Sequence, residues 1–338
     1  MAEDLSILIA NLGGLENLRP CLRSLFETTS ARIAFRVIVG FNFAGESETP
    51  RALAREFPQA IRLRAPIRLG YCRAYNQLIA CSTGRYVLLL DDDTILRAGT
   101  IEGMVRFMDA HPEVGIAGCR TVNPDGSYQK TTARMFDLRT ELVNILRPAA
   151  FWQDGIDETV AGWRSVGWLN GHFLMVRREV IETVGVLDEH YYTFQCEADW
   201  CLRICRAGWK VAYVPDFEIM HIGGSHSLAS AVKSYNNLIR GHLNRYYFIR
   251  KHYGDRAAHA FRAIMTGGAM LRLLNYAAIW LLKPDRRAEA GPKVRAYTEI
   301  ALAGVAPRPE TLPDELRREN AACSREALRP DPVFAGSA

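Results

Sequence analysis

Three consecutive aspartates, Asp91, Asp92 and Asp93, directly follow the apolar segment YVLLL at 86–90. This segment is typical of a buried strand, and open α/β sheets bind ligands beyond the carboxyl ends of their strands. On an extended backbone Asp91 and Asp93 project to one side and Asp92 to the other. Adjacent carboxylates repel one another unless neutralised, and their oxygens suit Mg²⁺ or Mn²⁺. The alternative is a solvated acidic turn before the next helix, and the motif alone leaves both open.

A second group of polar residues lies in the segments FQCEADWCLRICRAGWKVAYVP and FEIMHIGGSHS. Glu197 and Asp199 stand in the first turn of a predicted helix that ends at Gly208. Acids at this position often only complement the helix dipole, whereas a Glu that faces a cleft can act as a general base. His221 is expected at the end of a short strand, either as a metal ligand or as an ordinary core or loop histidine.

Short apolar segments alternate with amphipathic ones through the first half of the chain. Strands are predicted at 5–10, 35–41 and 86–90, and helices near 15–29, 47–57, 71–82 and 99–111. Strands this apolar are covered on both faces, which predicts a mostly parallel sheet between helices. The pattern is mixed beyond residue 111, so the predicted fold class is α/β, with α+β as the alternative.

The chain length of 338 residues predicts one large catalytic-sized domain with an appendage. We expect a catalytic domain at 1–229, a helical basic and apolar segment at 230–283, and a Pro-rich charged tail at 284–338. With 49% hydrophobic and 23% charged residues, whole-chain disorder, collagen and coiled coil are excluded. Eight cysteines without a CxxC pair, and a start that does not resemble a secretory leader, predict a protein of the reducing cytoplasm.

Basic residues are concentrated in one stretch of the chain. The formal net charge is +5, and the segment 233–262 alone carries +6, from Lys233, Arg240, Arg245, Arg250, Lys251, Arg256 and Arg262 against Asp255. The rest of the chain is therefore close to neutral. This distribution argues against a surface that coats nucleic acid.

Six motifs in a fixed order resemble the family-2 inverting glycosyltransferases of the GT-A fold, especially their bacterial rhamnosyltransferase-like branch. The resemblance covers about residues 5–255, and its landmarks are LGYCRAYNQ, LLLDDDT, LNGHFLMVRREVIETVGVLDE, the E-x-D-W-C helix, RAGWKVAYVP and HIGGSHS. Each motif alone is weak. Their order makes the resemblance specific.

The resemblance implies a dTDP- or UDP-linked sugar donor whose diphosphate is held by Mg²⁺ or Mn²⁺. Asp91, Asp93 and His221 match the family's metal ligands, and Glu197 matches its catalytic base, with Asp199 placed to orient the acceptor or the helix. Nucleotide contacts are implied for Asn11, Asn42, Arg68, Gly70, Asn76, Asp91 and Asp92. Acceptor contacts are expected from Gly171, His172 and Trp200, although a Trp in an α/β protein is most often a core residue.

Two positions depart from the family pattern. Phe41 and Asn42 stand where the family usually carries an acid that recognises the pyrimidine, so base recognition falls to Asn42, to Glu46 or to stacking on Phe41. Arg68 replaces an asparagine, and both a phosphate contact and an ordinary surface position remain open for it.

The expected activity is a single, non-processive sugar transfer, first of all of rhamnose from dTDP-rhamnose, to a saccharide or lipid-linked acceptor in cell-surface polysaccharide synthesis. One alternative is a sugar nucleotidyltransferase, but LIANLGGLENL lacks the basic, glycine-rich triphosphate loop of that class. The other is a non-catalytic membrane-bound scaffold, which the retained acids and His221 disfavour.

Residues 231–283 are expected to hold the enzyme at the cytoplasmic face of the inner membrane without crossing it. The stretch 260–282 is long enough to span a bilayer, but Arg262, Arg272 and Asn275 interrupt it. The alternative is that these helices pack on the catalytic domain or on a second subunit of a homodimer.

Overall fold

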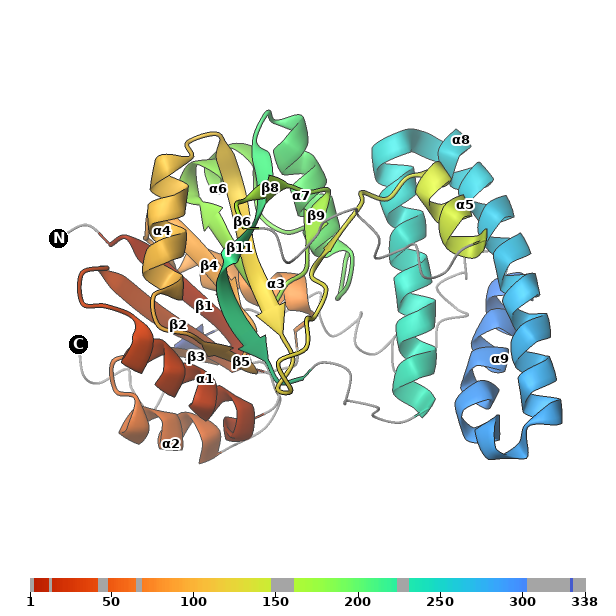
Figure 1. Ribbon diagram of the computed structural model, residues 1–338, viewed down its shortest axis with the longest axis horizontal. Helices are drawn as coiled ribbons and strands as arrows, with labels where there is room; N and C mark the ends of the chain where they lie inside the picture. The colour runs from red at the N-terminus through yellow and green to blue at the C-terminus, as the bar shows by residue number, and fades with distance from the viewer. Residues whose placement is uncertain are drawn as a thin grey trace. The chain divides into compact units, whose positions relative to one another are not determined.

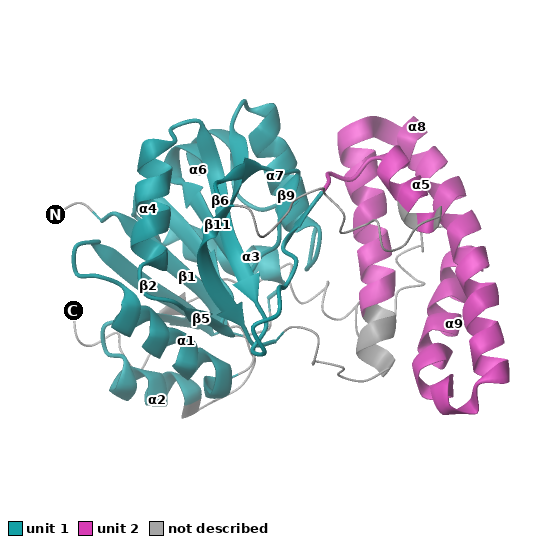
Figure 2. Cartoon of the chain, in the orientation of Figure 1, with its two compact units in different colours: residues 1–133, 154–224, 319–338 teal, residues 134–153, 225–318 magenta. Residues whose placement is uncertain are grey.

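The computed structural model describes residues 3–11, 14–41, 48–64, 69–146, 161–223, 231–302 and 329–330 (Figure 1). The chain forms two compact units, one of residues 1–133, 154–224 and 319–338 and the other of residues 134–153 and 225–318 (Figure 2). The first unit is α/β and the second is helical. Residues 134–153 group with the helical unit, although they lie inside the segment 1–229 in sequence.

Most strands of the α/β unit join one large sheet. Its strands are β1 (Leu5–Asn11), β2 (Phe35–Phe41), β3 (Ile61–Arg64), β4 (Tyr86–Leu90), β5 (Thr94–Leu96), β6 (Val114–Val122), β8 (Arg164–Ser165), β10 (Phe173–Arg177), β11 (Lys210–His221) and β12 (Arg329–Pro330). The order is β12-β3-β2-β1-β4-β10-β6-β11-β5, with β8 paired to β11. Two further strands, β7 (Thr132–Ala133) and β9 (Trp168–Leu169), form a separate pair.

The sheet is parallel where the sequence predicts it and mixed beyond. Strands β3, β2, β1 and β4 run parallel, which confirms the α/β class. Strand β10 is inserted antiparallel between β4 and β6, and β5 pairs antiparallel with β11. The inserted strand brings its own first residues to the carboxyl end of β4.

Helices cover both faces of the sheet (Figure 1). The helices of this unit are α1 (Leu15–Thr28), α2 (Glu48–Glu56), α3 (Tyr71–Ala80), α4 (Thr100–Ala110), α6 (Arg178–Val184) and α7 (Cys196–Arg206). On one face, Ile7 and Ile9 of β1 share a core with Leu22 of α1 and Met104 of α4. On the other face, β2 approaches α3 so closely that a Cβ at Gly40 would lie 3.1 Å from Leu78. Alternate residues of each apolar strand therefore contact different helices, as burial on both faces requires.

The helical unit contains α5 (Leu138–Leu146), α8 (Ala231–Leu282), a 3₁₀ turn (Pro284–Arg286) and α9 (Arg287–Leu302). Gly254 divides α8 into two helical segments, because its φ of 84° lies in the left-handed region that favours glycine. The expectation of a loose tail from residue 284 is wrong for 284–302. Ala296 and Ile300 of α9 are buried against Ile239 and Ala269 of α8. This packing stabilises the helical conformation of α9, although Pro292 lies inside it.

Candidate active site

Strand pairing places His172 beside Asp91. Phe173 of β10 pairs with Leu90 of β4, so the residues just before β10 and just after β4 are neighbours. The backbone N–H of Asp91 donates to the carbonyl of His172 at 3.2 Å. Two residues that are far apart in sequence thus meet at the carboxyl end of β4.

A second pairing brings His221 to Asp93. Thr94 of β5 pairs with His221 of β11, and the backbone N–H of Ile222 donates to the carbonyl of Asp93 at 2.9 Å. His221 Nε2 lies 3.1 Å from Asp93 Oδ1, and His221 Nδ1 lies 3.1 Å from Gln129 Oε1. The antiparallel edge strand β5 therefore fixes the imidazole beside the carboxylate.

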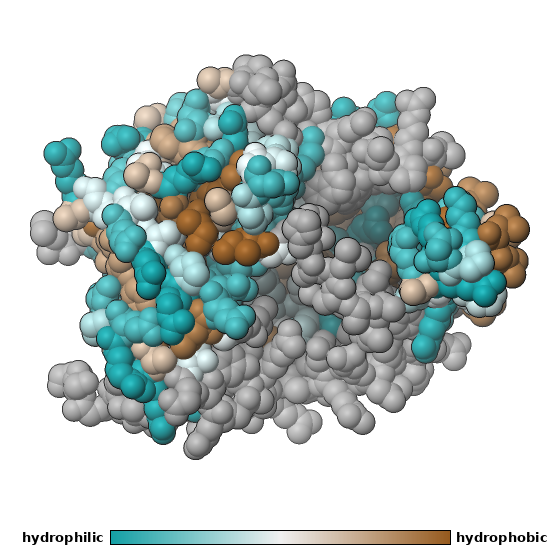
Figure 3. Space-filling model, turned by 60° about the horizontal axis from the view of Figure 1, so that its bottom comes forward, coloured by the Kyte–Doolittle hydropathy of each residue, from teal (hydrophilic) through white to brown (hydrophobic). Residues whose placement is uncertain are grey.

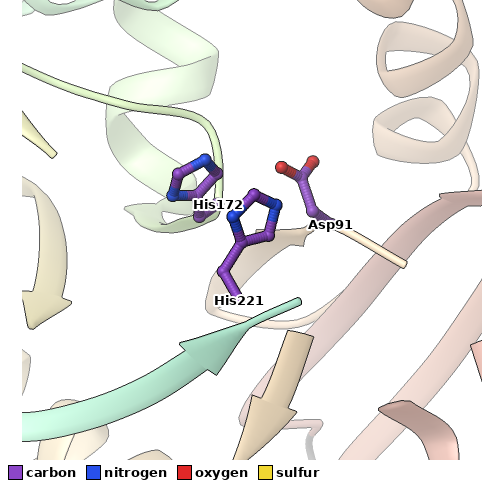
Figure 4. A group of neighbouring side chains, drawn as sticks. All are labelled: Asp91, His172 and His221. Carbon is purple, nitrogen blue, oxygen red and sulfur yellow. The ribbon is translucent and has the colours of Figure 1, made fainter. Parts of the chain in front are cut away.

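Asp91, His172 and His221 form a group with the geometry of a metal site. One ligand atom from each lies within 4.8 Å of the others, and the three side chains converge from three separate segments (Figure 4). The two imidazole rings stack with centroids 3.8 Å apart. We assigned His172 to the acceptor from the sequence, whereas the structure places it next to His221.

The residues present fit a divalent cation. Two neighbouring ligands of an octahedral ion with bonds of 2.0–2.1 Å are about 3 Å apart, which the spacing between His221 and Asp93 matches. Within the described part of the chain, the buried His172 Nδ1 has no hydrogen-bond partner. Carboxylate oxygens with neutral imidazole nitrogens are a suitable donor set for Mn²⁺ and, with more oxygen ligands, for Mg²⁺.

The electrostatics of the group favour neutralisation by a cation. Burial, together with the charges of Asp93, Asp92 and Glu197, raises the pKa of Asp91 well above its usual range. Burial acts in the same direction on Asp93, but the hydrogen bond to His221 and the charge of that ring outweigh it and lower its pKa. The charged form of Asp91 is thus held at a cost that a bound cation would relieve, whereas His221 already stabilises the charged form of Asp93.

Burial and the neighbouring His221 lower the pKa of His172 to about 3. The ring is therefore neutral near pH 7. A neutral imidazole keeps a lone pair available for a metal ligand role.

Asp92 contacts the end of the first strand, and with Asp93 it lies in a turn after β4. Asn11, at the end of β1, donates from Nδ2 to Asp92 Oδ2 at 2.6 Å and to the carbonyl of Gly14 at 2.9 Å. Asn11 is fully buried, and in the described part of the chain its Oδ1 has no hydrogen-bond partner. Asn11 thus joins the first strand to the aspartate motif.

Glu197 lies at the start of α7 and is only 9% exposed. Burial raises the pKa of its carboxyl, and Cys196 Sγ donates to Glu197 Oε2 at 3.3 Å. A Cβ added at Gly171 would lie 2.9 Å from Glu197 Oε1 and 2.6 Å from the hydroxyl oxygen of Tyr71. Glycine at position 171 therefore leaves room for these two side chains beside the loop that carries His172.

The sequence analysis missed Tyr71. Its hydroxyl is buried without a hydrogen-bond partner in the described residues, and burial with the nearby charges, including Asp91 and Glu197, raises its pKa well above the usual range. The available signal was its place directly after Gly70 in LGYCRAYNQ, where we considered only the glycine.

Asp199 is fully buried and serves a different purpose from Glu197. Its Oδ2 accepts a hydrogen bond from Arg203 Nε at 2.8 Å, and its Oδ1 accepts one from the Tyr191 hydroxyl at 3.5 Å. Arg203 also donates to the carbonyls of Val184 and Val186. This network connects α7 to the preceding loop, which favours a structural role for Asp199.

The structure contradicts the predicted acceptor contact of Trp200 and gives Asn76 a structural role. The ring of Trp200 is fully buried and its Nε1 donates to the carbonyl of Gly185 at 2.9 Å, so it cannot stack on an acceptor sugar. Asn76 donates to the carbonyl of Leu187 and to Glu189 Oε1, and accepts from the N–H of Leu187. The amide of Asn76 thus holds the loop 187–189, and its contact to the nucleotide stays a prediction.

Of the other residues expected to contact the nucleotide, Gly70 lies in the described part of the chain. A Cβ at Gly70 would lie 2.8 Å from the carbonyl oxygen of Tyr192, which itself accepts the N–H of Tyr71, so this glycine permits a close backbone approach. Asn42 and Arg68 lie outside the described residues. Their contacts to the donor stay predictions.

A family model decides the identity of the chain. Residues 6–185, more than half of the sequence, match the model described as "Glycosyl transferase family 2". The chain belongs to glycosyl transferase family 2. The match spans the aspartate motif, His172 and most of the sheet that positions them.

The relatives of this family-2 glycosyltransferase are rhamnosyltransferases. N-acetylglucosaminyl-diphospho-decaprenol L-rhamnosyltransferase of Mycobacterium tuberculosis is 28% identical over 244 residues, which cover 66% of this chain and 78% of the relative. Rhamnosyltransferase WbbL of Escherichia coli K12 is 23% identical over 142 residues, covering 40% and 52%. These matches confirm the resemblance to the rhamnosyltransferase-like branch.

Solved structures of glycosyltransferases share the fold. The mannosyltransferase PcManGT from Pyrobaculum calidifontis, solved with GDP-Man and Mn²⁺, aligns with a TM-score of 0.52 and 17% identity over 90% of this chain and 87% of its own. GalNAc-T7, solved with UDP, GalNAc and Mn²⁺, aligns with a TM-score of 0.52 and 14% identity over 75% and 50%. Such likeness at low identity confirms the GT-A-type architecture.

Proposed function

We propose that this glycosyltransferase transfers L-rhamnose from dTDP-rhamnose to a lipid-linked saccharide, one residue at a time and with inversion at the anomeric carbon. The relative from Mycobacterium tuberculosis, named for rhamnosyl transfer to N-acetylglucosaminyl-diphospho-decaprenol, supports this donor and acceptor class. The observation that carries the proposal is the group of Asp91, His172 and His221, with Asp93 beside His221 and the charge of Glu197 acting on Asp91.

Asp91, Asp93 and His221 would hold a divalent cation, with His172 available as a further ligand. When bound there, Mg²⁺ or Mn²⁺ supplies positive charge where the departing nucleoside diphosphate becomes negative. Asn11 fixes Asp92 through its amide nitrogen, and we propose that it supports the nucleotide site in this way. Gly70, Asn42 and Arg68 are proposed to contact the nucleotide from the neighbouring loops.

Glu197 is proposed to accept the proton that the acceptor hydroxyl loses during attack. The raised pKa of its carboxyl moves the group toward the range in which a base works efficiently near neutral pH. Cys196 orients one carboxylate oxygen, and the other faces the space beside Gly171. One base and one neutralised leaving group are sufficient for a single displacement, which inverts the anomeric carbon.

We place the reaction at the cytoplasmic face of the inner membrane, because a lipid-linked acceptor is confined to that surface. The basic and apolar helical unit supports a membrane location. Nucleic acid is not proposed as a partner, since the basic residues are confined to one stretch of the chain.

The test is a transfer assay with the purified full-length chain. Polyprenyl-diphospho-N-acetylglucosamine in detergent is incubated with dTDP-rhamnose, UDP-glucose or UDP-N-acetylglucosamine, with Mn²⁺, Mg²⁺ or EDTA. We expect rhamnosylated product with either metal and none with EDTA, and an inverted linkage by NMR. Transfer only from a UDP-sugar would refute the donor, undiminished transfer in EDTA would refute the metal, and synthesis of dTDP-rhamnose from dTTP and rhamnose 1-phosphate would favour a nucleotidyltransferase.

A further inference from the structure

The second segment of α8, residues 255–282, carries a line of exposed apolar side chains. Their spacing of one, three, four and seven residues places them on one face of the helix. Exposure reaches 70% at Leu274 and 79% at Leu282, and the members of this apolar stripe are Met270, Leu271, Leu274, Leu281 and Leu282. Hydrophobic surface gathers along the right-hand edge of the helical unit in Figure 3, beside a hydrophilic end.

The apolar stripe is not the face through which α8 packs within its own unit. Met265 and Ala269 of the same segment are buried, and a Cβ at Gly268 would lie 2.6 Å from Ile145 of α5. The helix is thus apolar on the packed face and again on the exposed one. An exposed apolar face of this length marks an interaction surface.

A cation stacked on an aromatic ring lies at one side of the apolar stripe. The Arg287 guanidinium lies 5.2 Å from the ring centre of Trp280 and donates to the Trp280 carbonyl at 2.9 Å. The Lys293/Tyr276 pair lies on the other side of α8, because Tyr276 stacks on Tyr297 of α9. Tryptophan and basic side chains beside an apolar face are a combination that binds at the headgroup level of a bilayer.

The net positive charge of residues 262–302 favours an anionic partner. Residues 262–302 carry seven Lys and Arg residues against three acids, Asp285, Glu289 and Glu299. Basic residues at this density attract anionic lipid headgroups. A symmetric contact between two copies of the stripe would instead bring the cations of both copies together, which disfavours a dimer through this face.

We propose that the apolar stripe docks in the plane of an anionic lipid bilayer, with the surrounding cations at the headgroups. The helix Asn237–Leu282 is long and apolar enough to cross a membrane by length and composition alone. Arg272 lies in the middle of the apolar stretch, however, and an in-plane helix leaves this charge at the headgroups. The inference deepens the membrane location in the proposed function, and it is tested separately because binding to lipid needs neither donor nor acceptor.

The experiment measures sedimentation of the purified full-length protein with phosphatidylcholine vesicles, with and without one quarter phosphatidylglycerol. We expect binding to the anionic vesicles that weakens with salt. The double variant Leu274→Glu/Leu281→Glu should bind about a hundredfold more weakly or worse, because two leucines that would be buried in the bilayer are lost. The matched control is Leu142→Glu/Val143→Glu, which adds the same two charges at exposed positions of α5 and should bind like the wild type.

The proposal would be overturned if the wild type did not bind the vesicles, or if the wild type and the stripe variant bound equally. It would also be overturned by a wild-type dimer that the variant converts to a monomer without loss of vesicle binding. Full retention in cell membranes after a carbonate wash would show a crossing helix and would also overturn it. Circular dichroism and rhamnosyl transfer in detergent are measured on both double variants, so that failure to fold or failure of the proposed activity is seen separately.

Discussion

Replacing Glu197 by Gln removes the proposed base while keeping the shape of the side chain. The amide can still accept the hydrogen bond from Cys196 and fits the space beside Gly171. A positioned general base contributes about a hundredfold to ten-thousandfold, so kcat should fall at least about a hundredfold. That loss corresponds to about 2.7 kcal/mol of transition-state stabilisation. Binding of dTDP-rhamnose should be retained, because the substitution leaves Asp91, Asp93 and His221 unchanged.

The pH profile distinguishes a lost base from a general disturbance. Burial raises the pKa of Glu197 in the folded enzyme, and only the carboxylate form accepts a proton. Activity of the wild type should therefore rise with pH through this raised pKa and be lost as pH falls below it. The residual activity of the variant should lack this acidic limb, which initial rates of transfer between pH 4 and 8 would reveal.

Asp199→Asn is the matched control on the same helix. Removing this charge leaves Arg203 without its buried partner, which costs about 3 kcal/mol of stability on typical values for such pairs. We expect a lower melting temperature with kcat of the folded enzyme largely kept. A large loss of kcat in Asp199→Asn together with normal turnover in Glu197→Gln would refute the assignment and move the base to Asp199.

Three further predictions concern neighbouring residues. Asp93→Asn should weaken Mn²⁺-dependent donor binding at least about tenfold without unfolding the protein; calorimetry that shows unchanged affinity for donor with Mn²⁺ would contradict the metal role. Gly171→Ala should lower kcat about tenfold to a hundredfold, because the added methyl would displace Tyr71 or Glu197; normal turnover would show that their positions do not matter. Asn76→Ala should cost about 2 kcal/mol of stability, seen in urea unfolding, with an unchanged KM for the donor; a raised KM with normal stability would support the nucleotide contact instead.

The sequence by itself determined the local elements and the chemistry that they carry. The alternation of apolar strands with amphipathic helices predicted β1, β2 and β4 with the helices that follow them, because the spacing of apolar residues within a segment is local information. The sequence likewise placed Asp91, Asp92 and Asp93 directly after a buried apolar strand. The first-turn position of Glu197 was equally local.

The tertiary structure alone decided which of these residues meet. The antiparallel insertion of β10 sets His172 against Asp91, and the pairing of β5 with β11 sets His221 against Asp93. Trp200 is a core residue and does not stack on the acceptor sugar, because its ring is fully buried and its Nε1 donates to the carbonyl of Gly185. Contacts such as these depend on strand register and packing between segments tens of residues apart, and the local pattern of a sequence carries no information about such pairings.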